Sequence, residues 1–246
     1  MIRKISVILL ASTIPFLGNA LAYAEIEKPN IEFATLTSEF PNGFRIKVKA
    51  TGETQIKSVA VRFKIGQQTS GVYEYLCQST EIKGPEWRCE DFEPGRVILG
   101  EFFWRTNTLS RYIPPGTIIN YNFEIEDSSG QVSSTESREF VYSDSRFKWS
   151  DVSEGPVTVS YYGPVKTRAV KILRAILETI NNMGAVLGSD MNQPIRVTAY
   201  NTIKDMLDAL PPGSTTIRRE LVTEGQAFTN VGTLLVLQGG RLAIGT

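Results

Sequence analysis

Apolar and polar residues alternate along the chain from Ile31 to Tyr142, and turn residues interrupt this pattern at short intervals. The clearest case runs from Ile119 to Glu126, where aliphatic or aromatic residues at odd positions alternate with Asn and Glu. Because successive side chains of a strand point to opposite faces, one face of this strand should be buried in the core and the other exposed to solvent. Further strands are expected at 44–49, 59–65, 73–76, 97–106 and 138–142. About seven strands predict an immunoglobulin-like or fibronectin-like β-sandwich.

The pattern changes after Ser143. Strands are expected at 157–161, 195–200 and 233–238, with a long helix starting near Pro164 and a short helix capped by Thr202 and Asp205 between them. The long helix carries an apolar stripe at helical spacing, which predicts that it packs on a sheet. Its members are Val165, Ala169, Ile172, Leu173, Ile176, Leu177, Ile180, Met183 and Leu187. The fold class is therefore α+β overall, with a mixed α/β region following the sandwich.

Residues 1–24 have the pattern of a secretory signal peptide. Arg3 and Lys4 precede an apolar core, and Ala22-Tyr23-Ala24 supplies small residues for cleavage. The apolar stretch is shorter than the roughly 20 residues of a spanning helix, and no later stretch is long and apolar enough to span a bilayer. We therefore expect export to the cell envelope or medium, with a β-sandwich accessory domain at 25–143 and a second domain at 144–246.

The net charge and the two cysteines bear on the partners and the redox environment of the protein. Lys plus Arg and Asp plus Glu number 26 each, so removal of Arg3 and Lys4 leaves 24 against 26, a formal charge of −2. That balance argues against a nucleic-acid partner. Cys77 and Cys89 are the only cysteines, and a disulfide between them is the simplest expectation in an oxidising compartment. Two free thiols and a metal site are the less favoured alternatives.

The sequence contains no histidine. This excludes Ser-His-Asp and Cys-His nucleophiles within these residues, together with zinc sites built on imidazole. Carboxylates cluster at Glu90-Asp91, Glu124-Glu126-Asp127 and Asp205-Asp208, but ordinary strand, turn and helix positions account for them. No phosphate-binding glycine motif is present, so no nucleotide cofactor is expected.

A series of landmarks resembles the peptidase MA-like family, a gluzincin-type group of exported zinc metallopeptidases that often carry a β-sandwich before the catalytic domain. The resemblance covers most of the chain after the signal peptide and depends on the order of the landmarks. They are Trp104-Arg105-Thr106, 112–116, YNFEIEDSSG at 121–130, YSDSRFKW at 142–149, 161–164, 183–188, PIRVTAYN at 194–201 and 225–228.

The resemblance implies that an H-E-x-x-H helix, which binds zinc and activates water, follows the strand at 233–238. The 246 residues hold no such motif, so we expect an N-terminal portion of a secreted zinc metallopeptidase that has no zinc, no cofactor and no activity of its own. A protein or peptide substrate is implied for the full-length relative. Gln226, Ala227 and Phe228 would form a sheet-edge strand that pairs with substrate, although a plain core strand is an equal alternative. The rival interpretation is a complete exported, non-enzymatic binding or structural protein with an immunoglobulin-like module.

Overall fold

The computed structural model describes residues 28–78, 93–187, 193–211 and 224–238, which are mostly β-strand. The strands form two sheets, one before and one after residue 143. The first sheet contains β1 (Asn30–Glu39), β2 (Gly43–Ile65), β3 (Val72–Tyr75), β4 (Cys77–Gln78), β5 (Gly95–Arg105), β6 (Thr117–Asp127), β7 (Val132–Ser134) and β8 (Arg138–Tyr142). The second contains β9 (Trp149–Glu154), β10 (Val157–Tyr162), β11 (Ile195–Tyr200), β12 (Gly225–Phe228) and β13 (Thr233–Leu237).

The first sheet is antiparallel and curls over its own core because β2 belongs to both of its halves. The first half of β2 pairs with β1 and β5, and the second half pairs with β3 and β6. The halves face each other, since Phe44 and Phe63 meet edge to face with ring centroids 5.5 Å apart. The separate strands predicted at 44–49 and 59–65 are thus one strand of 23 residues. Pairing with β1 ends at Thr51 and pairing with β6 begins at Ile56, so the partners change without ending the strand.

The alternation predicted around Ile119 is confirmed in β6. Ile119, Phe123 and Ile125 are buried, whereas the intervening Asn and Glu residues are partly exposed. The strands predicted at 73–76, 97–106 and 138–142 correspond to β3, β5 and β8. This part of the molecule is β-rich, as the sequence predicted.

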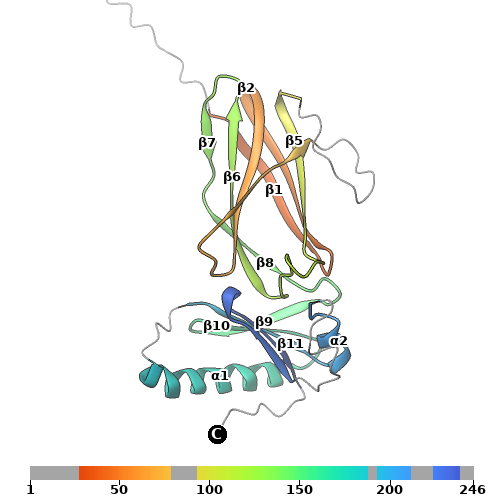
Figure 1. Cartoon of the computed structure of the whole chain (residues 1–246), viewed down its shortest axis with the longest axis vertical. Coiled ribbons are helices and arrows are strands. Elements are labelled where there is room, and N and C mark those ends of the chain that lie inside the picture. The colour runs from red at the N-terminus through yellow and green to blue at the C-terminus, as the bar shows by residue number, and fades with distance from the viewer. Residues whose placement is uncertain (1–27, 79–92, 188–192, 212–223, 239–246) are drawn as a thin grey trace, which may run out of the picture.

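The second sheet is mixed, with the order β12-β13-β11-β10-β9. The strands β10, β11 and β13 run parallel, and β9 and β12 run antiparallel at the two edges. Helix α1 (Lys166–Leu187) covers one face, burying Ala169, Ile172 and Leu173 (Figure 1). The predicted stripe packs on the sheet as far as Ile180, but Met183 is 50% exposed, so the stripe extends past the contact with the sheet.

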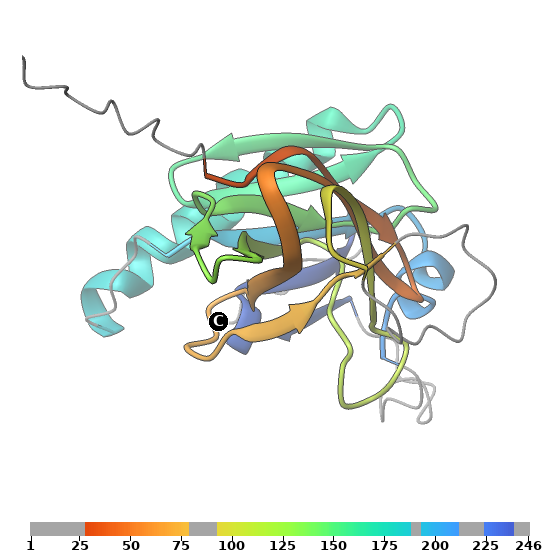
Figure 2. The same ribbon diagram turned by 90° about the horizontal axis from the view of Figure 1, so that it is seen from above.

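The first sheet stands on the opposite face of the second sheet, as the two views show (Figures 1 and 2). One hydrophobic cluster includes Phe44 and Tyr142 from the first sheet with Tyr200 and Leu235 from the second, so the core continues across the junction. Gly116 is one point at which the two sheets approach closely. It has a φ of +100°, and a Cβ there would lie 2.4 Å from Thr198 Oγ1. Only glycine suits both the conformation and the space.

Helix α2 (Ile203–Leu207) follows β11 as expected. Thr202 is its N-cap, and its hydroxyl oxygen accepts a hydrogen bond from the Asp205 backbone N–H. The predicted cap at Thr202 and Asp205 is therefore confirmed. Its buried residue, Met206, belongs to the cluster at the junction.

Candidate functional site

Gln226, Ala227 and Phe228, the residues predicted to form a substrate-edge strand, lie in β12. This strand pairs with β13 on one side, and no other strand of the described residues pairs with its second side. Gly225 and Ala227 are exposed, and Gln226 and Phe228 are half-buried. The structure therefore places the segment at the edge of the second sheet.

The hydrogen-bond pattern shows which backbone groups of β12 face outward. The Leu237 N–H donates to the Glu224 carbonyl oxygen at 2.8 Å, so this pair is hydrogen-bonded across the ladder. In an antiparallel ladder such pairs alternate with non-hydrogen-bonded ones. Gly225 and Ala227 consequently direct their N–H and C=O groups away from β13. The Gln226 side-chain amide reaches the Ala227 carbonyl oxygen at 3.3 Å, which agrees with an outward carbonyl.

A small groove of about 220 Å³ adjoins the end of β12. It is lined by Phe228 together with Trp104, Arg111, Tyr112 and Val231. The rings of Tyr112 and Phe228 lie 5.6 Å apart, and the Arg111 guanidinium lies 4.6 Å from the Trp104 ring centroid. The groove therefore combines aromatic walls with one cation.

Tyr112 is fixed in this groove by its hydroxyl, which donates to the Ala209 carbonyl oxygen at 2.6 Å. Burial raises the pKa of the Tyr112 hydroxyl, so it stays protonated. The Trp104 indole nitrogen is buried and has no hydrogen-bond partner among the described residues. Both residues belong to landmarks of the family resemblance, but sequence reasoning gave neither of them a role in a site, since no local motif indicates that they meet β12.

The turn between β12 and β13 sets the floor of the groove. The short 3₁₀ helix η1 (Thr229–Val231) ends at Gly232, which has a φ of +66°. The end of β2 meets η1 at Gly66, where a Cβ would lie 2.4 Å from the Val231 Cα. Close backbone packing therefore holds β12 against the first sheet.

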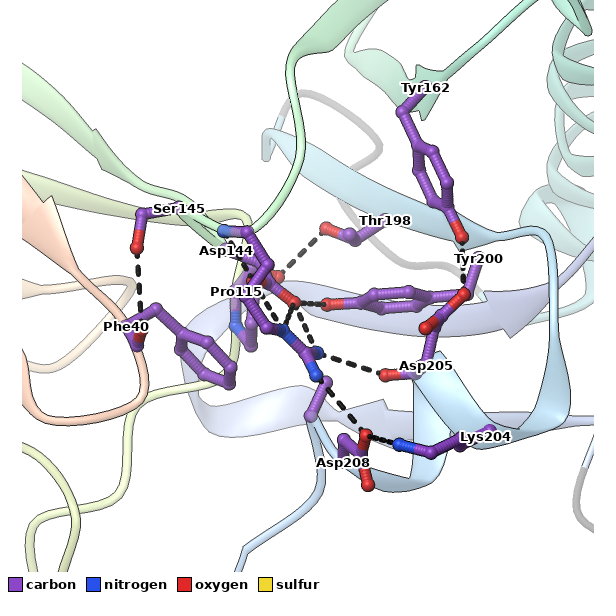
Figure 3. Close-up of polar contacts among 12 residues, drawn as sticks. Phe40, Pro115, Asp144, Ser145, Tyr162, Thr198, Tyr200, Lys204, Asp205 and Asp208 are labelled. Carbon is purple, nitrogen blue, oxygen red and sulfur yellow. Dashed lines mark hydrogen bonds and ion pairs between the residues drawn. The ribbon is translucent and has the colours of Figure 1, made fainter.

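A polar network lies at the junction of the two sheets (Figure 3). Asp144 is fully buried and accepts hydrogen bonds from Tyr200 Oη at 2.9 Å and from Arg146 Nη2 at 2.6 Å. Burial, followed by the charge of Asp144, raises the pKa of Tyr200. The hydrogen bonding of the Arg146 guanidinium to the Asp144 carboxylate is the main cause of the raised pKa of Arg146. This carboxylate is neutralised and fully bonded, which suits a structural role.

The remaining acidic residues singled out by the sequence also have partners. Asp205 accepts from Thr202 Oγ1 and Tyr162 Oη, and the first of these bonds is the main cause of its lowered pKa. Asp208 pairs with Lys204 and Arg146. Ion pairs and backbone bonds similarly occupy Glu124 with Arg62, Glu126 with Lys57, and Asp127 with Ser129 and Gln131. Glu90 and Asp91 lie outside the described residues.

The described residues do not fit the zinc ion that the family resemblance implies. Within 28–78, 93–187, 193–211 and 224–238, no three acidic or cysteine side chains gather as metal ligands. The sequence has no imidazole to supply the nitrogen ligands. The described residues therefore supply no set of ligands for a catalytic zinc ion.

Cys77 lies in β4, which pairs with β5 at the edge of the first sheet, and it is disulfide-bonded. Its predicted partner, Cys89, lies outside the described residues. The Cys77–Cys89 pairing stays a prediction.

Comparison with known proteins gives little guidance. No family model and no curated protein matches the chain. A solved structure, described as a Br derivative of BhCBM56, is 15% identical with a TM-score of 0.27, and the match covers 44% of this chain and 88% of that one. A similarity at that TM-score supports no inference about the fold or the function of this chain. Among the described residues, no helix has the length and apolar character that crossing a bilayer requires.

Proposed function

We propose that the second sheet and α1 form the N-terminal part of a zinc-peptidase-type lobe that binds an extended peptide along β12. The first sheet is, in this proposal, an immunoglobulin-like accessory module, and the protein acts outside the cytoplasm. The observation that carries the proposal is the outward-facing backbone of Ala227 on an antiparallel edge strand. The family resemblance supports the same assignment, since it places a substrate-pairing strand at these residues.

Strand addition gives the proposal its physical basis. A peptide in extended conformation would pair with the outward-facing N–H and C=O of Ala227 and with those of Gly225, and it would displace the Gln226 amide from the Ala227 carbonyl. These backbone bonds would be independent of the peptide sequence. Alternate side chains of such a peptide point to opposite faces of the extended sheet. The groove beside Phe228 and Tyr112 would then receive one apolar or acidic side chain, because aromatic walls and Arg111 line it.

In this proposal, peptide binding and peptide hydrolysis depend on different parts of the protein. These 246 residues supply the framework and the peptide-binding edge. Metal binding and water activation are assigned to an H-E-x-x-H helix, which the resemblance places after β13 and which these residues do not contain. The 246-residue chain should therefore bind peptides without cleaving them.

The test is fluorescence anisotropy with labelled, extended casein peptides and the 246-residue protein. Ala227→Pro removes the outward N–H and places a ring on the free edge, but it leaves the ladder to β13 intact. We expect at least about tenfold weaker binding, which corresponds to the loss of one hydrogen bond and the added steric block. Ala227→Ser keeps the N–H and should bind as the wild type does.

Unfolding midpoints of both variants would show that β12 still pairs with β13. Peptide binding that is absent in the wild type, or equal in the Pro and Ser variants, would contradict the proposed edge. Hydrolysis is followed on the same peptides with added zinc and with a chelator. Chelator-sensitive cleavage by the 246-residue chain would contradict the division of roles. A longer chain that carries an H-E-x-x-H helix should cleave them.

A further inference from the structure

A hollow of about 910 Å³ lies on the first sheet, and Val72 is the residue that its lining shares with the groove beside β12. Three strands line it, namely β2, β3 and β6. The side chains that face it include two tyrosines, two asparagines and two cations. They are Tyr73, Tyr75, Asn120, Asn122, Arg62 and Lys64.

The strand register arranges these side chains in rows across the sheet. Arg62 lies opposite Tyr73 on one side and opposite Asn122 on the other, and Lys64 lies opposite Asn120. Neighbouring strands are about 4.8 Å apart, so the row of Tyr73, Arg62 and Asn122 runs roughly 10 Å across the sheet. Tyr75 lies opposite Ala60, two residues further along β3. The surface is long enough for more than one ring of a bound chain.

The tyrosine edge presents an aromatic surface to solvent. Tyr73 is 40% and Tyr75 is 56% exposed, and their rings meet edge to face at 5.4 Å. Tyr73 is fixed in place, since its hydroxyl donates to Glu124 Oε1 at 3.0 Å and the Arg62 guanidinium lies 5.0 Å from its ring centroid. Arg62 is also paired with Glu124 at 3.0 Å. The ring of Tyr75 is thus held in a defined position beside the hollow.

The opposite edge carries amide groups that the protein does not use. Asn120 and Asn122 are half-buried, and among the described residues neither side chain has a hydrogen-bond partner. Each amide offers two donors and one acceptor without any charge. Lys64 lies between the two edges and likewise makes no ion pair within the described part of the chain.

This combination favours a hydroxylated ring compound over other partners. The aromatic face of Tyr75 can stack on the C–H groups of one sugar ring, and the amides can donate to and accept from the hydroxyl groups of a neighbouring ring. Strand addition by an extended peptide would use the backbone edge of β3, whereas the exposed tyrosines and the asparagine amides lie on the face of the sheet. A nucleic acid would need several free cations, whereas Arg62 is already paired.

We propose that this hollow is a carbohydrate-binding site in which Tyr75 stacks on one sugar ring of a bound chain and Asn120 and Asn122 hydrogen-bond the hydroxyl groups of a neighbouring ring. The site is independent of the peptide edge at β12. It would attach the protein to a polysaccharide surface. Lys64 adds affinity for glycans that carry carboxylates.

Affinity electrophoresis of the 246-residue protein in gels containing a soluble β-glucan, xylan or alginate tests the site. We expect retardation by at least one of these polymers. Tyr75→Ala and the double substitution Asn120→Ala and Asn122→Ala should each weaken it by about tenfold, the effect of losing one stacking or a pair of hydrogen-bonding contacts. Tyr75→Phe keeps the ring and should retain binding.

Phe33→Ala is the matched control, since Phe33 is an exposed aromatic residue on β1 outside the hollow. It should bind as the wild type does. Retardation by alginate that Lys64→Gln reduces would support an acidic glycan, and retardation by a neutral polymer that Lys64→Gln leaves unchanged would support a neutral one. Absence of retardation by all three polymers, or an equal loss in Phe33→Ala, would overturn the proposal. Thermal unfolding of each variant shows that the fold is kept.

Discussion

The hydroxyl of Tyr200 donates a hydrogen bond to Asp144 Oδ2 at 2.9 Å, and both residues are completely buried. Tyr200 ends β11 in the second sheet, and Asp144 follows β8 of the first. Arg146 neutralises the same carboxylate, so the bond joins the two sheets without leaving an unpaired charge. The junction is therefore specified by a polar contact inside an otherwise hydrophobic cluster.

Tyr200→Phe should destabilise the protein by about 1–3 kcal/mol, because the buried carboxylate loses one of its donors. Tyr161→Phe is the matched control. Tyr161 is also buried in the second sheet, but its hydroxyl has no hydrogen bond within the described residues. Urea unfolding should give a clearly larger loss for Tyr200→Phe, and equal losses would contradict a specific role for the bond to Asp144.

Gly116→Ala should destabilise the protein more than Gly130→Ala. Both glycines have positive φ, +100° and +83°, so both substitutions carry a conformational cost of about 1–2 kcal/mol. A Cβ at Gly116 would also lie 2.4 Å from Thr198 Oγ1, whereas nothing lies within 4 Å at Gly130. The difference between the two unfolding free energies measures the tight contact between the sheets, and similar values would show that the junction can relax.

The contacts at the junction explain why sequence reasoning succeeded for one part of the fold and failed for another. The alternation from Ile119 to Glu126 has a local cause, the two-residue period of a strand. The strand could therefore be predicted from the sequence. The continuity of β2 depends on a change of partners between Thr51 and Ile56, which is a tertiary property. Two short strands were therefore predicted where one long strand exists.

The candidate sites likewise combine features with a local sequence signal and features that depend on tertiary contacts. The position of β12 in the order of landmarks indicated a strand at a sheet edge, with a plain core strand as an equal alternative. The groove beside it joins Trp104 and Tyr112 to Phe228, which is more than 100 residues away in the sequence. The hollow joins Tyr75 to Asn120 through β2. No local pattern shows that such distant side chains meet.

Acid should remove the stabilising contribution of Asp127. Its carboxylate accepts hydrogen bonds from Ser129, Thr54 and the Gln131 backbone, and these bonds, those of Ser129 first, lower its pKa to about 2. Because the folded pKa lies below the unfolded value of about 3.9, the contribution is complete above that value and is lost as the pH falls toward 2.

The measurement is the free energy of urea unfolding for the wild type and Asp127→Asn from pH 7 to pH 2. Contributions of other carboxylates cancel in the difference between the two proteins. We expect that difference to be constant above about pH 5 and to shrink between pH 4 and pH 2. A difference that stays constant throughout would contradict the role of the Asp127 charge.

Mass spectrometry of non-reduced peptides should recover Cys77 linked to Cys89. The two positions enclose a short loop, for which the chain-entropy model gives a stabilisation of about 3 kcal/mol. Cys77→Ala should therefore lower the free energy of unfolding by a similar amount, and reductant should have no further effect on that variant. Two thiols that alkylate freely in oxidised protein would refute the pairing.

Expression of the two predicted regions as separate chains tests how they depend on each other. Residues 25–143 contain both halves of β2 and the core between them, so this region should unfold cooperatively on its own. Its midpoint should lie several degrees below that of the whole chain, because the end that carries Phe40 and Tyr142 loses its cover. Residues 144–246 should show no cooperative transition, since the face of their sheet that carries Tyr200 and Leu235 loses the part of the shared cluster that the first region supplies.

Calorimetry and circular dichroism of each chain measure whether it unfolds cooperatively and at which midpoint. Mixing the two chains is the matched control for the second region, and it should restore a cooperative transition if the shared cluster is what stabilises it. A sharp transition for 144–246 alone would show that α1 and its sheet form a sufficient core. A broad transition for 25–143 would show that the first sheet needs the junction in order to fold.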